Sequence, residues 1–142
     1  MRQMVYSIKI IIICFFLIIN ASVAKSDYFT QGKNFFDKKE FEKSKIFFER
    51  DIVFNPRSEN SYLYLAKIFQ EKENDNEEEI NLNNVLLINP KNDEAIYMLT
   101  LLKIKQSNYD KAEELIGQFI LVCKSLCSKQ TEMREKLDKL LP

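Results

Sequence analysis

The stretch NPRSENSYLYLAKIFQEKENDNEEEINLNNVLLINP, residues 55–90, begins and ends with the same dipeptide. Its prolines, Pro56 and Pro90, lie 34 residues apart, and a fixed period of this length is typical of helical repeat proteins. Proline disfavours a helical residue before it and cannot continue the hydrogen-bond ladder, so each Asn-Pro is expected to end a helix. Between the two prolines, one face of a helix is marked by apolar residues at i, i+3, i+4 and i+7, which are Tyr62, Leu65, Ala66 and Phe69.

The period divides most of the chain into three blocks, residues 25–58, 59–92 and 93–126. Position 8 of each block is small, and position 24 is large and apolar. The residues at these two positions are Gly32, Ala66, Thr100, and Phe48, Leu82, Ile116. Small residues let two paired helices approach closely, and large ones fill the gaps between successive pairs. The pattern therefore predicts an all-α stack of helical pairs.

These residues resemble the tetratricopeptide repeat (TPR) family, whose 34-residue unit is a pair of antiparallel helices. The resemblance covers residues 25–126 and implies a right-handed superhelix of three TPR helix hairpins. The third block departs from the family pattern, because Lys103 stands at position 11 and Lys124 replaces the proline. This block is interpreted as a terminal repeat that leads into a final helix.

The middle block departs from the pattern at Asp75 and Glu78, which replace an aromatic and a small residue. We interpret the acidic run from Glu71 to Glu79 as the solvated turn between the two helices of this block. Calcium binding by this run is the alternative, but it lacks the glycine and the ligand order of an EF-hand loop. No metal site is therefore expected.

Residues 1–24 are interpreted as a secretory signal peptide. Arg2 and Lys9 precede the run of ten apolar residues from Ile10 to Ile19, and Ser22 and Ala24 form a small-x-small cleavage pattern. An uncleaved anchor is the alternative, but a bilayer core needs about 20 apolar residues. A lipoprotein is disfavoured because the cysteine of this segment lies inside the apolar run. The membrane is thus expected as a transient partner only, through the signal peptide.

The charge and composition of the remaining chain disfavour several function classes. Cleavage leaves 19 Lys and Arg against 21 Asp and Glu, so no basic excess marks a nucleic-acid partner. There is no histidine and there are only two glycines, which excludes histidine triads, histidine zinc motifs and glycine-rich phosphate loops. We expect no enzyme activity and no cofactor. The bias toward Ile, Lys, Asn and Phe, together with the signal, favours a bacterial protein exported to the periplasm.

Cys123 and Cys127 are a candidate disulfide, since an even pair in an exported chain favours a bridge. Side chains at i and i+4 of a regular helix run nearly parallel, which suits a disulfide poorly. A bridge therefore requires the helix to break, and Ser125 and Ser128 are suitable N-cap residues for a new helix. Two buried free thiols are the alternative.

Residues 127–142 are expected to form a capping helix over the last repeat, because a repeat array needs a terminal element that covers its apolar end. Met133, Leu137 and Leu140 share one face of this segment. A helix that docks on a partner in trans is the alternative.

The family resemblance also implies a concave groove lined by the first helix of each repeat. The positions carried over give an apolar floor with a charged border, which suits a peptide or a helix. They are Phe29, Lys33, Phe36, Leu63, Lys67, Gln70, Tyr97, Leu101 and Ile104. Packing between helices is the alternative role for Phe29 and Phe36. The carboxylate clamp of one TPR subgroup is incomplete, because Phe29 stands where a lysine would be.

The sequence favours a non-enzymatic interaction scaffold or assembly factor that binds a segment of another envelope protein. A subunit or regulator of an envelope enzyme complex, docked through the convex face or the last helix, is the second interpretation. A redox-active thiol protein is the third, although only Lys124 and Lys129 lie near the cysteines. Three repeats are near the minimum for a stable array, so homo-oligomers are compatible with the sequence.

Overall fold

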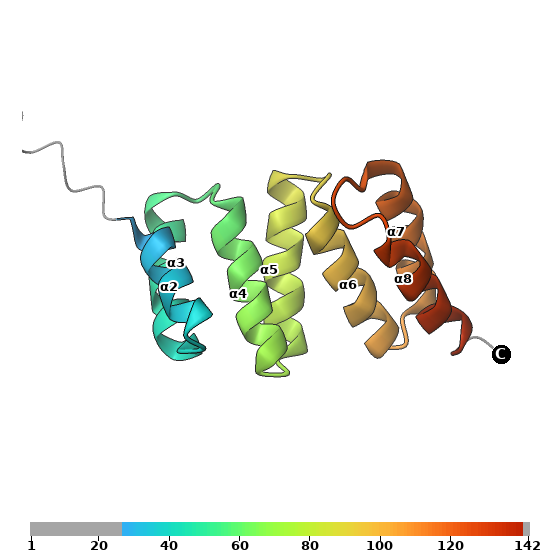
Figure 1. Cartoon of the computed structure of the whole chain (residues 1–142), viewed down its shortest axis with the longest axis horizontal. Coiled ribbons are helices and arrows are strands. Elements are labelled where there is room, and N and C mark those ends of the chain that lie inside the picture. The colour runs from blue at the N-terminus through green and yellow to red at the C-terminus, as the bar shows by residue number, and fades with distance from the viewer. Residues whose placement is uncertain (1–26, 141–142) are drawn as a thin grey trace, which may run out of the picture.

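The computed structural model describes residues 27–140, which are all-α (Figure 1). The expected signal peptide lies outside the described residues. The seven helices of the described part are α2 (Tyr28–Asp37), α3 (Phe41–Phe54), α4 (Glu59–Glu71), α5 (Asp75–Ile88), α6 (Asp93–Lys105), α7 (Tyr109–Val122) and α8 (Lys129–Asp138). None of these helices is both long enough and apolar enough to cross a lipid bilayer.

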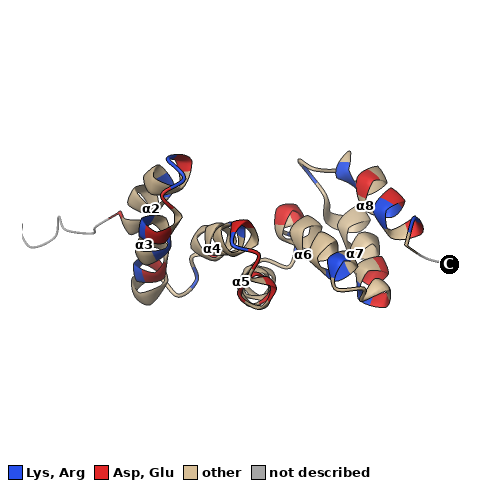
Figure 2. Ribbon diagram, turned by 90° about the horizontal axis from the view of Figure 1, so that it is seen from below, with Lys and Arg blue, Asp and Glu red and all other residues tan. Residues whose placement is uncertain are grey.

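The helices α2 to α7 form three antiparallel pairs that follow one another along the long axis of the molecule (Figures 1 and 2). Each pair falls within one of the three sequence blocks, and its second helix ends just before the next block begins. The first helices of the pairs, α2, α4 and α6, line one side of the array. The helix α8 packs against α6 and α7 at the C-terminal end.

The small residue at position 8 permits the close packing within the first pair, as predicted. A Cβ atom on Gly32 would lie 2.7 Å from Cε1 of Phe48, which is fully buried. The Ser44 hydroxyl also donates a hydrogen bond of 2.8 Å to the Gly32 carbonyl. The equivalent Ala66 and Thr100 are fully buried as well.

Each pair turns through a residue with positive φ at the same repeat position. Lys39, Glu73 and Ser107 have φ values of 59°, 53° and 58°. A left-handed residue just after the helix ends the first helix of the pair. The second helix of the later two pairs then begins at an asparagine N-cap, Asn74 or Asn108, whose side chain accepts a backbone hydrogen bond.

The buried apolar residues form two clusters. The N-terminal cluster joins the first two pairs and is built on Phe48, Leu65, Ile68 and Phe69, with several half-buried aromatic residues around it. The main cluster joins the second pair, the third pair and α8. Its largest fully buried members are Leu82, Ile96, Leu115, Ile116, Phe119, Met133 and Leu137.

The interpretation of the acidic run as a solvated turn is wrong for most of its length. The turn is confined to residues 72–74, and α5 begins at Asp75. Glu78 lies in the first turns of α5 and is only 3% exposed, because position 20 of the repeat faces the partner helix. Lys103, the other unusual residue, is also buried, and its ammonium lies 2.6 Å from the Glu79 carboxylate.

The C-terminal segment caps the array in cis. Met133 and Leu137 of α8 are 0% and 1% exposed, so the apolar face of this helix is occupied within the chain. Leu140, expected on the same face, is 51% exposed because α8 already ends at Asp138.

The connection between α7 and α8 contains the helix break that a disulfide requires. α7 ends at Val122 and α8 begins at Lys129. Between them, Cys123 and Cys127 are joined by a disulfide, with their Cα atoms 5.2 Å apart. The bridge closes the loop that leads into the cap.

The carboxylate of Asp93 holds the same loop from the start of α6. It accepts hydrogen bonds from the backbone N–H groups of Lys124, Ser125 and Leu126 at 2.9, 2.9 and 3.2 Å. Partial burial by itself would raise the pKa of Asp93, but these bonds outweigh it and lower the pKa to about 2. The Asp93 carboxylate thus fixes this loop, which has Lys124 where the first two repeats have a proline.

We expect Asp93→Asn to lower the free energy of unfolding by about 1–2 kcal/mol at neutral pH, because charge-assisted bonds to the loop are weakened. The folded-state pKa is depressed, so this stabilisation is present above pH 3.8 and is lost as the pH falls toward about 2. Denaturant titrations of wild type and variant should therefore converge in acid. Asp138→Asn, at the end of α8, is the control. If the difference in the free energy of unfolding between wild type and Asp93→Asn stayed the same in acid, the role given to the ionised Asp93 carboxylate would be wrong.

Candidate peptide-binding groove

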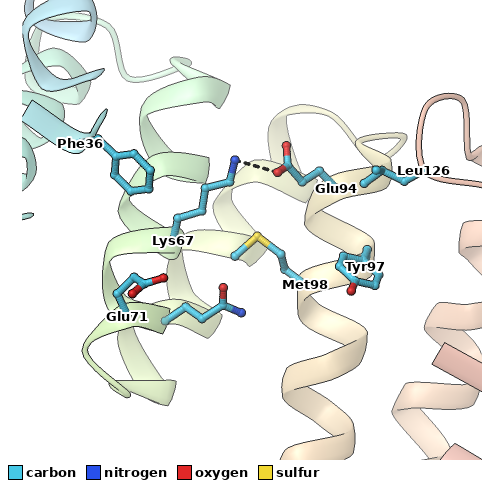
Figure 3. Close-up of a pocket in the computed structure, with 8 residues that line it drawn as sticks. Phe36, Lys67, Glu71, Glu94, Tyr97, Met98 and Leu126 are labelled. Atoms are coloured by element: carbon cyan, nitrogen blue, oxygen red, sulfur yellow. Dashed lines mark ion pairs between the residues drawn. The ribbon is translucent and has the colours of Figure 1, made fainter. Parts of the chain in front are cut away.

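A pocket of about 300 Å³ lies between the first helices of the three pairs (Figure 3). Its walls come from α2, α4 and α6, with one residue from the loop before α8. The lining residues are Phe36, Lys67, Gln70, Glu71, Glu94, Tyr97, Met98 and Leu126. A pocket of this size admits a few side chains of a bound segment.

An ion pair between neighbouring repeats borders the pocket. The Lys67 ammonium on α4 lies 2.7 Å from the Glu94 carboxylate at the start of α6 (Figure 3). The same ammonium lies 4.9 Å from the ring centroid of Tyr64, a cation–π distance. Both side chains keep part of their surface open, at 24% for Lys67 and 40% for Glu94. The pair therefore presents a fixed dipole to anything that enters the pocket.

The apolar part of the pocket is supplied by Phe36, Met98, Leu126 and the ring of Tyr97. Phe36 is held from behind by Tyr64, whose ring meets it edge-on with centroids 5.0 Å apart. Met98 is only 5% exposed and forms part of the floor. Because these residues come from different helices and a loop, the pocket depends on the stacking of all three repeats.

Helix α8 fixes the orientation of Tyr97. The Tyr97 hydroxyl donates a hydrogen bond of 3.0 Å to the Glu132 carboxylate, which also pairs with Lys129 and Lys136 at 2.8 and 3.0 Å. The two lysines lower the pKa of Glu132 to about 2, whereas burial and the carboxylate raise the pKa of Tyr97. The carboxylate is therefore ionised at neutral pH and the phenol is neutral, which suits this hydrogen bond.

A smaller hollow of about 110 Å³ lies beside Gln70, between α4, α5 and α6. Leu101, Leu102, Lys105 and Glu78 line it. Gln70 donates a hydrogen bond of 3.2 Å to the Glu78 carboxylate. Gln70 thus borders both hollows.

The nine predicted groove residues fall into three groups in the structure. The two hollows are lined by Phe36, Lys67, Gln70, Tyr97 and Leu101. Leu63 and Ile104 are 6% and 7% exposed and belong to the main cluster, so they contribute to packing and not to the open surface.

The remaining two predicted residues lie in the first pair. The Phe29 ring packs on Phe48 and Tyr64, with both centroid distances at 5.7 Å, which is the packing role considered as its alternative. Lys33 forms an exposed ion pair with Asp37 one turn further along α2. Neither residue lines the two hollows.

Two apolar residues that line the larger pocket, Met98 and Leu126, are not among the predicted groove positions. Met98 stands at position 6 of the third repeat, which the family pattern does not assign to the groove. Leu126 reaches the pocket only because Asp93 binds its backbone N–H and the loop folds back. The periodicity of the helices therefore does not indicate that Met98 or Leu126 lines the pocket.

The described residues contain no group of three acidic or cysteine side chains that converge as metal ligands.

The fold has a counterpart among solved structures. The crystal structure of the Sgt2 TPR domain from Aspergillus fumigatus is similar over 83% of this chain and 82% of that chain, with a TM-score of 0.68 and 14% sequence identity. The chain therefore has the tetratricopeptide repeat fold, with three helix hairpins and a capping helix. No protein-family model matches the sequence. No curated protein matches it either.

Proposed function

We propose that this protein is a non-enzymatic interaction scaffold or assembly factor of the bacterial periplasm. It binds an extended or helical segment of another envelope protein in the groove between α2, α4 and α6. The periplasmic location rests on the signal peptide expected in residues 1–24. The binding role rests on the groove itself and on the repeat fold, since stacked repeats form concave surfaces that are used for binding.

The observation that carries the proposal is the pocket with an apolar floor and the Lys67–Glu94 pair beside it. Apolar anchors in a pocket supply most of the affinity of a bound segment, and charges at its border fix direction. The dipole of the ion pair points along the array from the Glu94 carboxylate in the third repeat to the Lys67 ammonium in the second. A bound segment is therefore expected to run in one direction only.

Reversing the ion pair tests the groove while it retains opposite charges facing each other between α4 and α6. In Lys67→Glu/Glu94→Lys the pair is retained but its direction is inverted, so we expect capture of the partner to fall roughly tenfold, the effect of losing one good charged contact. The measurement is a crosslinked pull-down from an envelope fraction, with the chain expressed from its own full-length sequence. Changing Tyr97 to alanine is less informative, because its hydroxyl also holds α8.

The matched control is Lys45→Glu/Glu49→Lys, which inverts an ion pair of 2.7 Å within α3, outside the two hollows. Wild type and this control should capture the same dominant protein. Equal capture by the groove reversal would move the binding site away from the pocket.

A further inference from the structure

A large apolar residue is exposed at the same position of all three repeats. Val53, Leu87 and Leu121 are 73%, 82% and 85% exposed, and each is the second-to-last residue of its helix. Phe54, next to Val53, is 74% exposed. Single exposed apolar residues are common, but three at one repeat position form a row along the array.

The row follows one long edge of the molecule. Because α3, α5 and α7 all end there, the edge contains the three connections 55–58, 89–92 and 123–128, along the top of Figure 1. We call these connections, with Val53, Phe54, Leu87 and Leu121, the loop edge. The residues that line the larger pocket lie on α2, α4 and α6, with Leu126 as the one residue shared between the pocket and these connections.

The loop edge carries unpaired positive charge. Each connection contains one basic residue, Arg57, Lys91 or Lys124, and no acidic residue. All three are exposed, and none forms an ion pair within the described part of the chain.

The nearest acidic side chains are already engaged. Glu59 accepts hydrogen bonds from the side chains of Asn89 and Asn92, at 2.8 and 2.5 Å. Asp93 is bound by the backbone of the last connection. The basic side chains, in contrast, form no hydrogen bond or ion pair within the described residues, so they are free to contact a neighbour.

The chain also enters the fold at this edge. The ring of Tyr28, at the start of α2, stacks on the exposed Phe54 with centroids 5.5 Å apart. Residues 1–26 precede this point, and they include the apolar run from Ile10 to Ile19. The described part of the chain therefore begins at the loop edge.

We propose that the loop edge rests on an anionic lipid surface, with Val53, Phe54, Leu87 and Leu121 at the lipid and the three basic residues at the headgroups. One apolar residue per repeat suits a fluid surface that receives each side chain separately, whereas protein hot spots cluster at one centre. Basic residues add attraction to anionic lipids. The groove lies on α2, α4 and α6 and not on the loop edge, so a protein partner can bind in the groove while the loop edge contacts the lipid.

The chain contains no tryptophan, so a single introduced tryptophan reports on one position. We would place the full chain on vesicles of phosphatidylglycerol and phosphatidylcholine that contain brominated lipid. Fluorescence of Leu87→Trp and Leu121→Trp is expected to shift to the blue and to be quenched roughly twofold or more, since an interfacial residue is buried about 5–10 Å deep. Leu140→Trp is the matched reporter, because Leu140 is 51% exposed beyond the end of α8, at the opposite edge. It should remain unquenched.

Two pairs of charge reversals, made in the Leu87→Trp background, test the proposed attraction between the basic residues and anionic lipid. Lys91→Glu/Lys124→Glu should abolish the quenching, whereas Lys38→Glu/Lys139→Glu, with the same change in net charge at the opposite edge, should leave it intact. Quenching that is equal at all three reporters, or absent at the loop edge, would overturn the proposal. So would equal quenching on vesicles of phosphatidylcholine alone. A blue shift without lipid that grows with protein concentration would instead identify a second copy of the chain as the occupant.

Discussion

Replacing Gly32 with valine is expected to unfold the first helical pair, at a cost of about 3 kcal/mol, the upper end of the usual range for overpacking a core. Already a Cβ atom at this position would lie 2.7 and 2.8 Å from two ring carbons of Phe48. That ring is fully buried against Tyr64 and Phe29, at centroid distances of 5.1 and 5.7 Å, so it has little room to move. The two branches of valine would also displace the Ser44–Gly32 hydrogen bond.

The other glycine of the chain provides the control. Gly117 lies within α7, and a Cβ atom there would meet nothing within 4 Å. Gly117→Ala should therefore stabilise the protein by about 0.5–1 kcal/mol through helix propensity alone. Chemical denaturation followed by circular dichroism measures both variants. A Gly32→Val protein as stable as wild type would show that Phe48 yields more easily than the packing suggests, and Gly32→Val/Phe48→Leu should recover part of the loss.

Glu78→Gln is expected to stabilise the protein by about 2 kcal/mol above pH 7. Burial, and next to it the negative charge of Asp75, raise the pKa of Glu78 from 4.5 to about 7. Among the described residues its one hydrogen-bond donor is the neutral Gln70 amide, so the ionised carboxylate is poorly compensated. Glutamine keeps the size and an acceptor oxygen without the charge.

The sign of the pH dependence follows from the raised pKa. Between pH 4.5 and about 7 the unfolded chain is ionised at this residue while the folded chain still holds the proton, so wild-type stability falls as the pH rises through this window. Below pH 4.5 the wild type and Glu78→Gln should have similar stability. Equilibrium unfolding across this range measures the difference between the two proteins. A difference that does not change with pH would contradict the raised pKa.

The pH comparison is specific because the other shifted carboxylates lie outside this window. Asp93 and Glu132 have pKa values lowered to about 2, so their contributions change only in acid. Glu79→Gln is the control at the adjacent residue, since the pKa of Glu79 is lowered, mainly by the Lys103 ammonium. Glu79→Gln should lower the stability of the protein and should not show the stabilisation above pH 7 that is expected of Glu78→Gln.

The helical pairs could be predicted from the sequence because each boundary has a local cause. A helix ends just before Asn-Pro at both places where this dipeptide occurs, and the spacing of Pro56 and Pro90 fixes the length of the repeat. The small residue at position 8 likewise has a local signal, since Gly32 and Ala66 stand in register with the prolines. The Asn-Pro dipeptides and the small residues at position 8 can be read from the local sequence without knowledge of the residues that pack against them in the fold.

Burial of charged residues was not predictable in the same way. Glu78 lies in a run of acidic residues that is typical of a solvated turn, yet its register in α5 directs it at α4 and α6. The packing of the repeat overrides the local preference of the side chain. Lys103 is tolerated for a related reason, because Glu79 of the preceding repeat supplies its counter-charge.

The candidate groove could be predicted only in part, because its walls depend on how neighbouring repeats meet. Lys67 and Tyr97 were found from the family positions alone. Leu63 and Ile104 also stand at groove positions of the family but are buried in the main cluster. Leu126 belongs to a loop whose course is set by Asp93, and no helical periodicity describes it.

The division of the core into two clusters means that the first hairpin can open without the rest of the molecule. The N-terminal cluster holds α2 and α3 against α4, whereas the main cluster and α8 hold α4 to α7 together. Amide hydrogens of α2 and α3 should therefore exchange with solvent before those of α6 and α7. Each such opening withdraws Phe36 from the groove while Lys67, Glu94 and Tyr97 keep their places. The affinity of the groove is thus coupled to the local stability of a hairpin that supplies only one of its walls.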